Sequence, residues 1–162
     1  QLGSVSDVVL LPLSVYFCDN SAMRFNMNLR TVNDDGDKVL DLDLELEEQV
    51  DEHWEIRAIV DQWQNGAWDT IYDLDGSLCE NLQDFGAKAW SNARAALTPR
   101  VEDECLLQPG TYTLRGFEIT KDDYNLPVPI LGKYRVTATF VNGVGDEAVC
   151  LVVELESNKR KD

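Results

Sequence analysis

A strict alternation of leucine and acidic residues over positions 40–47 constrains the fold more than any other feature of the chain. Leucine occupies each even position from Leu40 to Leu46, and Asp or Glu occupies each odd position from Asp41 to Glu47. Successive side chains of a strand point to opposite faces, so this period of two predicts a half-buried antiparallel strand. The acidic residues are therefore expected to form a solvated sheet face and not a metal site.

Similar patterns elsewhere predict an all-β protein. Turn signals separate the alternating segments, and the cluster Asn33–Asp37 contains an Asp-Gly step that suits a hairpin turn. Many short strands with turns between them are typical of an antiparallel sandwich or cup. The expected strands cover residues 23–29, 40–46, 54–60, 112–119, 134–141 and 149–155.

One short helix is expected over about residues 77–97. Ser77 and Glu80 have the spacing of a capping box, with Ser at the N-cap and Glu three residues later. Apolar residues then recur at near-helical spacing. The helix is expected to be interrupted near Gly86 and to end before Pro99.

The chain of 162 residues has the length of one domain, which we place over residues 18–156. Residues 1–17 are expected to add a strand to this domain, and residues 157–162 to form a frayed, charged tail. The chain begins at Gln1 and not at Met, which suits a mature secreted product whose signal peptide has been removed.

The charge balance excludes some partners. With 14 basic and 30 acidic residues, the net charge is −16. Binding to nucleic acid is carried by Lys and Arg, so a nucleic-acid partner is excluded. Attraction to anionic membrane surfaces is disfavoured for the same reason. The simplest use of the charge is a strongly solvated surface.

Four cysteines, Cys18, Cys79, Cys105 and Cys150, favour disulfides over a metal site. Their number is even, no Cys-x-x-Cys occurs, and His53 is the only histidine, so a zinc site would have few ligands. Disulfides form in oxidising compartments, so we expect a secreted protein or one in the lumen of a secretory or lysosomal compartment.

Asp73 and Asp75 form the one pattern that resembles a catalytic motif. The sequence from Ile71 to Leu78 looks like the opening motif of haloacid-dehalogenase-type phosphatases. That chemistry needs a buried parallel strand to aim the first Asp and alternating β-α units after it. The residues before Asp73 form no continuous apolar strand, and the units are absent. The sequence therefore predicts no catalytic residue, no metal site and no cofactor.

Apolar residues also occur where polar ones are usual. The segment 124–131 should be a loop because Pro127 and Pro129 interrupt helix and strand alike, yet it is apolar. Trp63 and Trp68 flank a Gly-containing turn. Each residue alone is better explained by core packing, but together with the aromatic residues of the helix they favour an apolar cavity.

Three segments together resemble a known family. They are Cys105–Leu114 with Gly110-Thr111-Tyr112, Leu126–Arg135 with Gly132-Lys133-Tyr134, and the final strand with Cys150. They resemble the ganglioside activator proteins, which are related to the myeloid-differentiation-related lipid-recognition (ML) domains. The resemblance covers roughly Cys18 to Leu155. The chain lacks two disulfides of that family, carries 17 residues before Cys18 and is more acidic, as in insect-type secreted relatives.

This resemblance implies an antiparallel β-cup of immunoglobulin-like topology with an apolar cavity. It also implies that Cys18 pairs with Cys150 and Cys79 with Cys105. Trp63 and Trp68 are the candidates for a lip that contacts membranes transiently. The candidates for the lipid-pocket wall are Trp54, Ile56, Phe85, Trp90, Leu126, Val128, Ile130 and Leu131.

The function expected from these features is that of a secreted, non-catalytic, monomeric protein that binds or transfers a lipid or fatty-acyl ligand. An extracellular protein-interaction or signalling module on the same fold, with an unknown protein receptor, is the alternative. A phosphatase that uses Asp73 and Asp75 is a remote third.

Overall fold

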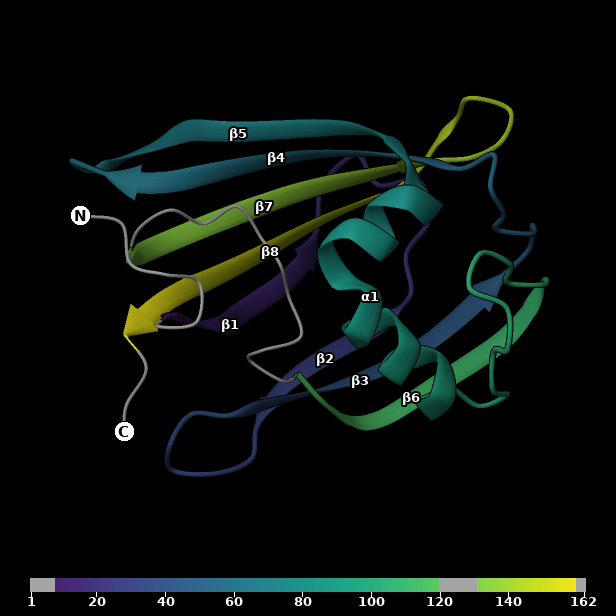
Figure 1. Ribbon diagram of the computed structural model, residues 1–162, viewed down its shortest axis with the longest axis horizontal. Helices are drawn as coiled ribbons and strands as arrows, with labels where there is room; N and C mark the ends of the chain where they lie inside the picture. Colours follow the sequence, from purple (N-terminus) through teal and green to yellow (C-terminus); the bar gives the residue numbers. More distant parts are fainter. Residues whose placement is uncertain (1–7, 120–130, 160–162) are drawn as a thin grey trace.

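The computed structural model describes residues 8–119 and 131–159, drawn in colour in Figure 1. In this part of the chain, eight strands form two antiparallel sheets, with helix α1 beside them. The all-β class and the sandwich predicted from the sequence are confirmed. The elements run β1 Val8–Phe17, β2 Asn26–Thr31, β3 Lys38–Leu46, β4 Glu55–Gln64, β5 Ala67–Ser77, α1 Leu78–Ala96, β6 Gly110–Glu118, β7 Gly132–Val141 and β8 Glu147–Lys159.

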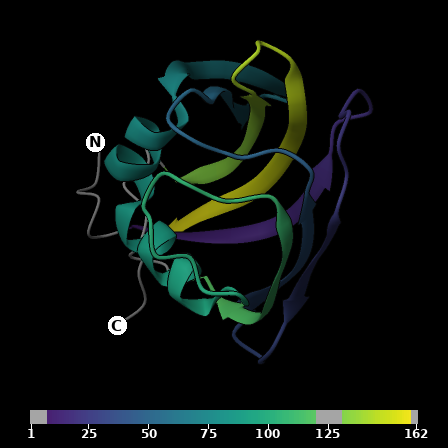
Figure 2. The ribbon, with the colours of Figure 1, turned by 90° about the vertical axis from the view of Figure 1, so that its right-hand side faces the viewer.

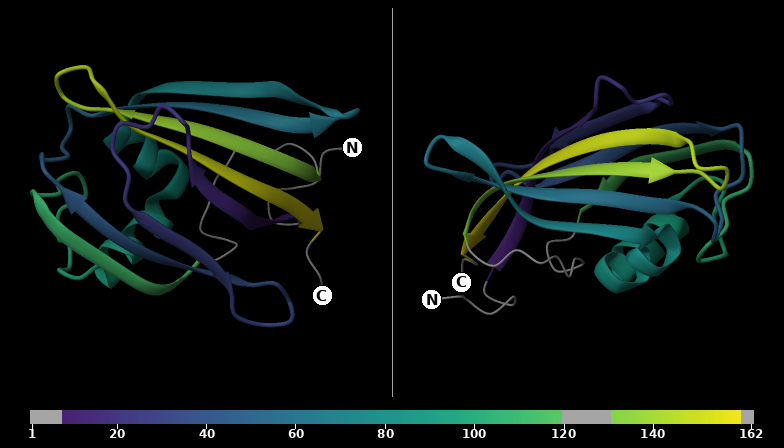
Figure 3. Two further views of the ribbon diagram at one scale, coloured as in Figure 1. Left: turned by 180° about the vertical axis from the view of Figure 1, so that it is seen from behind. Right: turned by 90° about the horizontal axis from the view of Figure 1, so that it is seen from above.

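The two sheets face each other as the layers of an open sandwich (Figures 1 and 2). The larger sheet has the strand order β1-β8-β7-β4-β5, and the smaller one has the order β2-β3-β6. Strands β1 and β2 contact each other along one side of the sandwich, and α1 contacts β4, β5 and β6 on the other. Figure 3 shows α1 behind the sheets in the view from the back. The sheets are therefore bridged on two sides around a common interior.

The alternation in the sequence determines which residues face this interior. In the β2–β3 ladder, Met27 pairs with Leu42 and Leu29 with Leu40, and all four line a common cavity. Polar partners occupy the outer face, where Arg30 Nε donates to Asp41 Oδ2 at 2.6 Å. The predicted half-buried strand with an acidic outer face is confirmed.

Helix α1 begins and bends where the sequence predicts. The backbone N–H of Glu80 donates to Ser77 Oγ at 3.3 Å, which makes Ser77 the N-cap. Gly86 has non-helical dihedral angles (φ −152°, ψ 30°), so the helix is kinked there. Its last turn is followed by Leu97, whose N–H bonds to Ala93 O at 2.9 Å. No helix in the described residues is long and apolar enough to cross a membrane.

The prediction of a frayed tail over 157–162 is wrong for residues 157–159. Strand β8 continues to Lys159, and the side chain of Ser157 is almost completely buried. Ser157 pairs with Leu10 on one side and Gly132 on the other, and its Oγ accepts the Gly132 N–H at 3.1 Å. Pairing with β1 on one side and β7 on the other keeps this end of β8 in the sheet despite its polar sequence. Residues 160–162 lie outside the described part, as do residues 1–7 of the predicted N-terminal strand.

Strand β5 was not expected from the sequence. A bulge between Val60 and Asp61 explains this, because Val60 pairs with Tyr72 and Asp61 with Thr70. Ile71 is left without a partner in the ladder, and the apolar alternation is broken there. Strand β5 is also an edge strand, and its residues are exposed or only half-buried.

A two-compartment apolar cavity as the candidate functional site

Two apolar compartments lie in the interior of the sandwich. The larger one lies between β1, β7 and β8 of one sheet and β2 and β3 of the other. Its volume is about 470 Å³, and every lining side chain is apolar. We call it the outer compartment. It is lined by Leu10, Pro12, Val15, Phe25, Met27, Leu29, Leu40, Leu42, Ile119, Val136, Leu151, Val153 and Leu155.

A smaller compartment of about 240 Å³, here called the inner compartment, lies between the sheets and α1. Trp54 and Trp90 contribute to its wall, and Glu104 is the single charged residue in it. The indole N–H of Trp54 donates to Gln49 O at 2.9 Å and that of Trp90 to Glu104 O at 2.7 Å. Both rings are thus oriented by a satisfied donor while their apolar surfaces remain available to the cavity.

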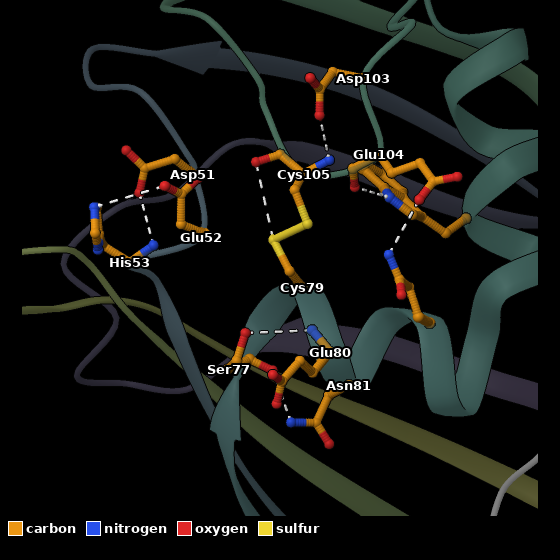
Figure 4. The surroundings of a disulfide bond; sticks show 12 residues. Asp51, Glu52, His53, Ser77, Cys79, Glu80, Asn81, Asp103, Glu104 and Cys105 are labelled. Carbon is orange, nitrogen blue, oxygen red and sulfur yellow. Dashed lines mark hydrogen bonds and ion pairs between the residues drawn. A yellow bond between two sulfur atoms is a disulfide. The ribbon is translucent and has the colours of Figure 1, made fainter.

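The Cys79–Cys105 disulfide forms part of the inner wall (Figure 4). It joins the first turn of α1 to the loop before β6. Around it, Asp103 accepts the N–H of Cys105 at 2.8 Å, and Gln83 Nε2 donates to Glu104 at 3.1 Å. The Cys18–Cys150 disulfide joins the end of β1 to β8. Both pairings implied by the family resemblance are confirmed.

Phe25 and Leu151 line both compartments and therefore lie between them. Phe25 precedes β2, and its ring packs edge-on against Phe17, with ring centroids 5.0 Å apart. Leu151 pairs with Phe17 in the β1–β8 ladder. Sequence reasoning did not select these two residues, although both belong to alternating apolar segments.

Not all of the predicted wall residues that the structure describes line a compartment. Trp54 and Trp90 line the inner compartment. Ile56 is half-buried opposite Phe140 but lines neither compartment. Leu131 is 52% exposed and lines neither, so it is not a wall residue of these cavities. Leu126, Val128 and Ile130, and the side chain of Phe85, lie outside the described residues.

Trp63 and Trp68 lie at the β4–β5 turn, where they form an edge-to-face pair with centroids 5.2 Å apart. Trp63 is 46% exposed, while Arg135 lies over the Trp68 ring at 4.6 Å. Neither residue lines either compartment. Their role as a membrane lip stays a prediction.

The arrangement of Asp73 and Asp75 does not match a phosphatase site. Both are exposed on β5, an edge strand that pairs antiparallel with β4, so neither is aimed from a buried parallel strand. Among the described residues, no group of three or more His, Cys, Asp or Glu side chains could hold a metal ion. Asp75 and Gly76 lie at the end of β5, directly before Ser77, the N-cap of α1.

A pKa shift occurs on the outer face of the smaller sheet. A hydrogen bond from Arg30 lowers the pKa of Asp41 to about 2, assisted by the backbone N–H of Gly116 at 2.8 Å. The same pair raises the pKa of Arg30. At the Asp51 turn, the N–H of His53 and the side chain of Gln49 lower the carboxyl pKa. These charges are satisfied on the surface and leave the cavity apolar.

No family model matches the chain, and no curated protein matches its sequence. Among solved structures, the chain is similar to the crystal structure of chicken MD-1 complexed with lipid IVa, with a TM-score of 0.42 and 17% sequence identity. The match covers 93% of this chain and 90% of that chain. The class defined by the fold and the site is an antiparallel β-sandwich with an internal apolar cavity.

Proposed function

We propose that the protein is a secreted, non-catalytic carrier that binds the acyl chain of a lipid between its two sheets. The outer compartment carries this proposal, because about 470 Å³ of space is lined by apolar side chains alone. Ligand sites are typically clefts of about 300–1,000 Å³ with mostly apolar walls. A cavity of this size and composition suits a hydrocarbon and offers no polar group for binding a sugar or a nucleotide.

Burial of methylene groups supplies the driving force. Each one contributes about 0.8 kcal/mol, so a twelve-carbon chain gains about 10 kcal/mol before the cost of lost motion, which is about 4–15 kcal/mol. At the low end of that cost, the net gain is about 6 kcal/mol, which corresponds to a Kd of about 40 μM without a specific headgroup contact. We expect the polar headgroup to remain in water.

Two disulfides support a site of action in an oxidising compartment, outside the cell or in a lumen. The exposed Trp63 supports transient contact with a membrane during loading, because indole rings favour the interface between hydrocarbon and water. We expect the carrier to act as a monomer. The alternative, a protein-interaction module on the same fold, requires a filled interior, and the outer compartment disfavours it.

Native mass spectrometry of the protein from a lipid-containing source, together with displacement of a fluorescent acyl probe, tests the proposal. Leu42→Gln places an amide in the outer compartment and should weaken probe binding at least tenfold. Glu45→Gln changes an exposed position of the same strand and should bind as the unmodified protein does. Absence of any lipid adduct and of probe binding by the unmodified protein would refute the proposal.

A further inference from the structure

The two compartments follow each other along the strands and do not lie side by side across the sheet. Strand β3 shows this directly, since Leu40 and Leu42 line the outer compartment and Leu44 and Leu46 the inner one. Strand β8, which runs in the opposite sheet, divides in the same order: Val153 lines the outer compartment, Leu151 lines both, and Val149 lines the inner one.

The length of this apolar path follows from strand geometry. Leu40 and Leu46 are six residues apart, which corresponds to about 20 Å at ~3.4 Å per residue. A hydrocarbon chain with C–C bonds of about 1.5 Å at angles of about 111° advances about 1.25 Å per carbon. An extended chain of about 16 carbons therefore matches the distance from the outer to the inner end.

Among the described residues, the inner compartment offers no free polar group to a headgroup. Glu104 is the one charged residue in its wall, but it is exposed, and its carboxylate accepts a hydrogen bond from Gln83 on the surface. The indole N–H groups of Trp54 and Trp90 already donate to backbone carbonyls, so a headgroup that entered would lose its hydration without gaining a hydrogen bond. The terminal methyl group of a chain is the part that can enter the inner compartment without losing hydration.

We propose that the two compartments act as one passage, joined at Phe25 and Leu151, that takes a single-chain lipid with a tail of about 16 carbons, methyl end first. This inference rests on the proposed function and adds the ligand class and a length limit. The inner compartment sets the limit on tail length, because short chains end before they reach it.

A series of saturated fatty acids from 8 to 20 carbons, measured by isothermal titration below their critical micelle concentrations, tests the length limit. Each methylene that enters the passage should raise affinity about fourfold. The gain should stop at about 16 carbons, because further methylenes remain in water. A gain that continues unchanged to 20 carbons, or one that stops at 10, would overturn the inference.

A matched pair of substitutions on one face of β3 distinguishes the contributions of the two compartments to binding. Leu44→Trp narrows the inner compartment and should leave binding of the 8-carbon acid within twofold while lowering that of the 16-carbon acid at least tenfold. Leu40→Trp narrows the outer compartment and should weaken both acids. Equal weakening of both acids by Leu44→Trp would contradict the proposed order of the compartments.

A quenching measurement covers the case in which the bulky variants fail to fold. In a Trp63→Phe/Trp68→Phe chain, the two remaining tryptophans, Trp54 and Trp90, both line the inner compartment. Bound 16-bromohexadecanoic acid should quench their fluorescence by more than half, and bound 10-bromodecanoic acid should quench it little. Equal quenching by both acids would refute a methyl-first passage. Absence of binding by every acid, in the unmodified chain, would instead refute the proposed function itself.

Discussion

Arg135 holds the buried carboxylate of Asp61 through two donors, with Nε at 3.1 Å and Nη2 at 2.8 Å from the same oxygen, Oδ2. The other oxygen of Asp61 accepts the hydroxyl of Thr70 at 2.7 Å, and the guanidinium also covers the ring of Trp68. The side chain of Asp61 is only 9% exposed. These contacts therefore connect β4, β5 and β7 on the outer face of the larger sheet.

Removal of Arg135 should destabilise the fold strongly. Arg135→Leu leaves the buried Asp61 carboxylate with one partner, and loss of one member of a buried ion pair costs about 3–5 kcal/mol. Urea unfolding should show a fall of this size in the free energy of unfolding. The Asp61→Leu/Arg135→Leu chain should recover much of the loss, since no uncompensated charge remains. A double variant as unstable as the single one would contradict this account.

Protonation of Asp41 should weaken the fold only at low pH. Its folded-state pKa of about 2 lies below the ordinary value of about 3.9, so its ionised form is the one that the fold favours. The stabilisation is complete above about pH 4 and is lost as the pH falls through about 2. Asp41→Asn should therefore be less stable than the unmodified protein at pH 7, and the difference should shrink between pH 4 and pH 2. Urea unfolding at several pH values checks this, and a constant difference would refute it.

The two disulfides should differ in their effect on lipid binding. In the chain-entropy model, loss of Cys18–Cys150 costs about 5 kcal/mol and loss of Cys79–Cys105 about 3.6 kcal/mol. Only Cys79–Cys105 forms part of a compartment wall. The Cys79→Ser/Cys105→Ser chain should therefore bind the 16-carbon acid more weakly even at temperatures where it is folded. The Cys18→Ser/Cys150→Ser chain, measured when folded, should keep its affinity.

Trp63 should affect exchange with membranes more than binding in solution. Trp63→Ala removes an exposed indole at the β4–β5 turn and should slow lipid transfer from zwitterionic vesicles severalfold. Val144→Ala offers a matched control, since Val144 is 83% exposed on the hairpin between β7 and β8. Stopped-flow transfer of a fluorescent lipid measures both. Equal rates for the two variants would exclude a lip at Trp63.

Local patterns in the sequence predicted much of the fold. The alternation around Leu42 indicated the half-buried face of β3, and Ser77 indicated the start of α1, because both signals depend on neighbouring residues alone. Strand β5 could not be predicted in the same way, since the bulge at Ile71 interrupts its alternation. Burial of Ser157 depends on Gly132, which is 25 residues away in the sequence.

The sequence predicted an apolar cavity but identified only some of the residues in its wall. Trp54 and Trp90 lie in the inner wall, whereas Leu131 is exposed. The position of Phe25 and Leu151 between the compartments depends on how far apart the two sheets lie, and no local pattern in the sequence encodes that distance. A period of two shows which face of a strand is apolar, but not whether the opposite sheet fills the space in front of it.

The two edge strands of the larger sheet have a consequence for the behaviour of the protein at high concentration. An exposed edge can recruit a strand from another molecule and start aggregation. Strand β1 carries Pro12 beside an irregularity in its ladder, and strand β5 carries the bulge at Ile71 together with exposed Asp69, Asp73 and Asp75. These features discourage intermolecular strand pairing, so the aspartates that imitate a catalytic motif are well placed to keep the protein in solution.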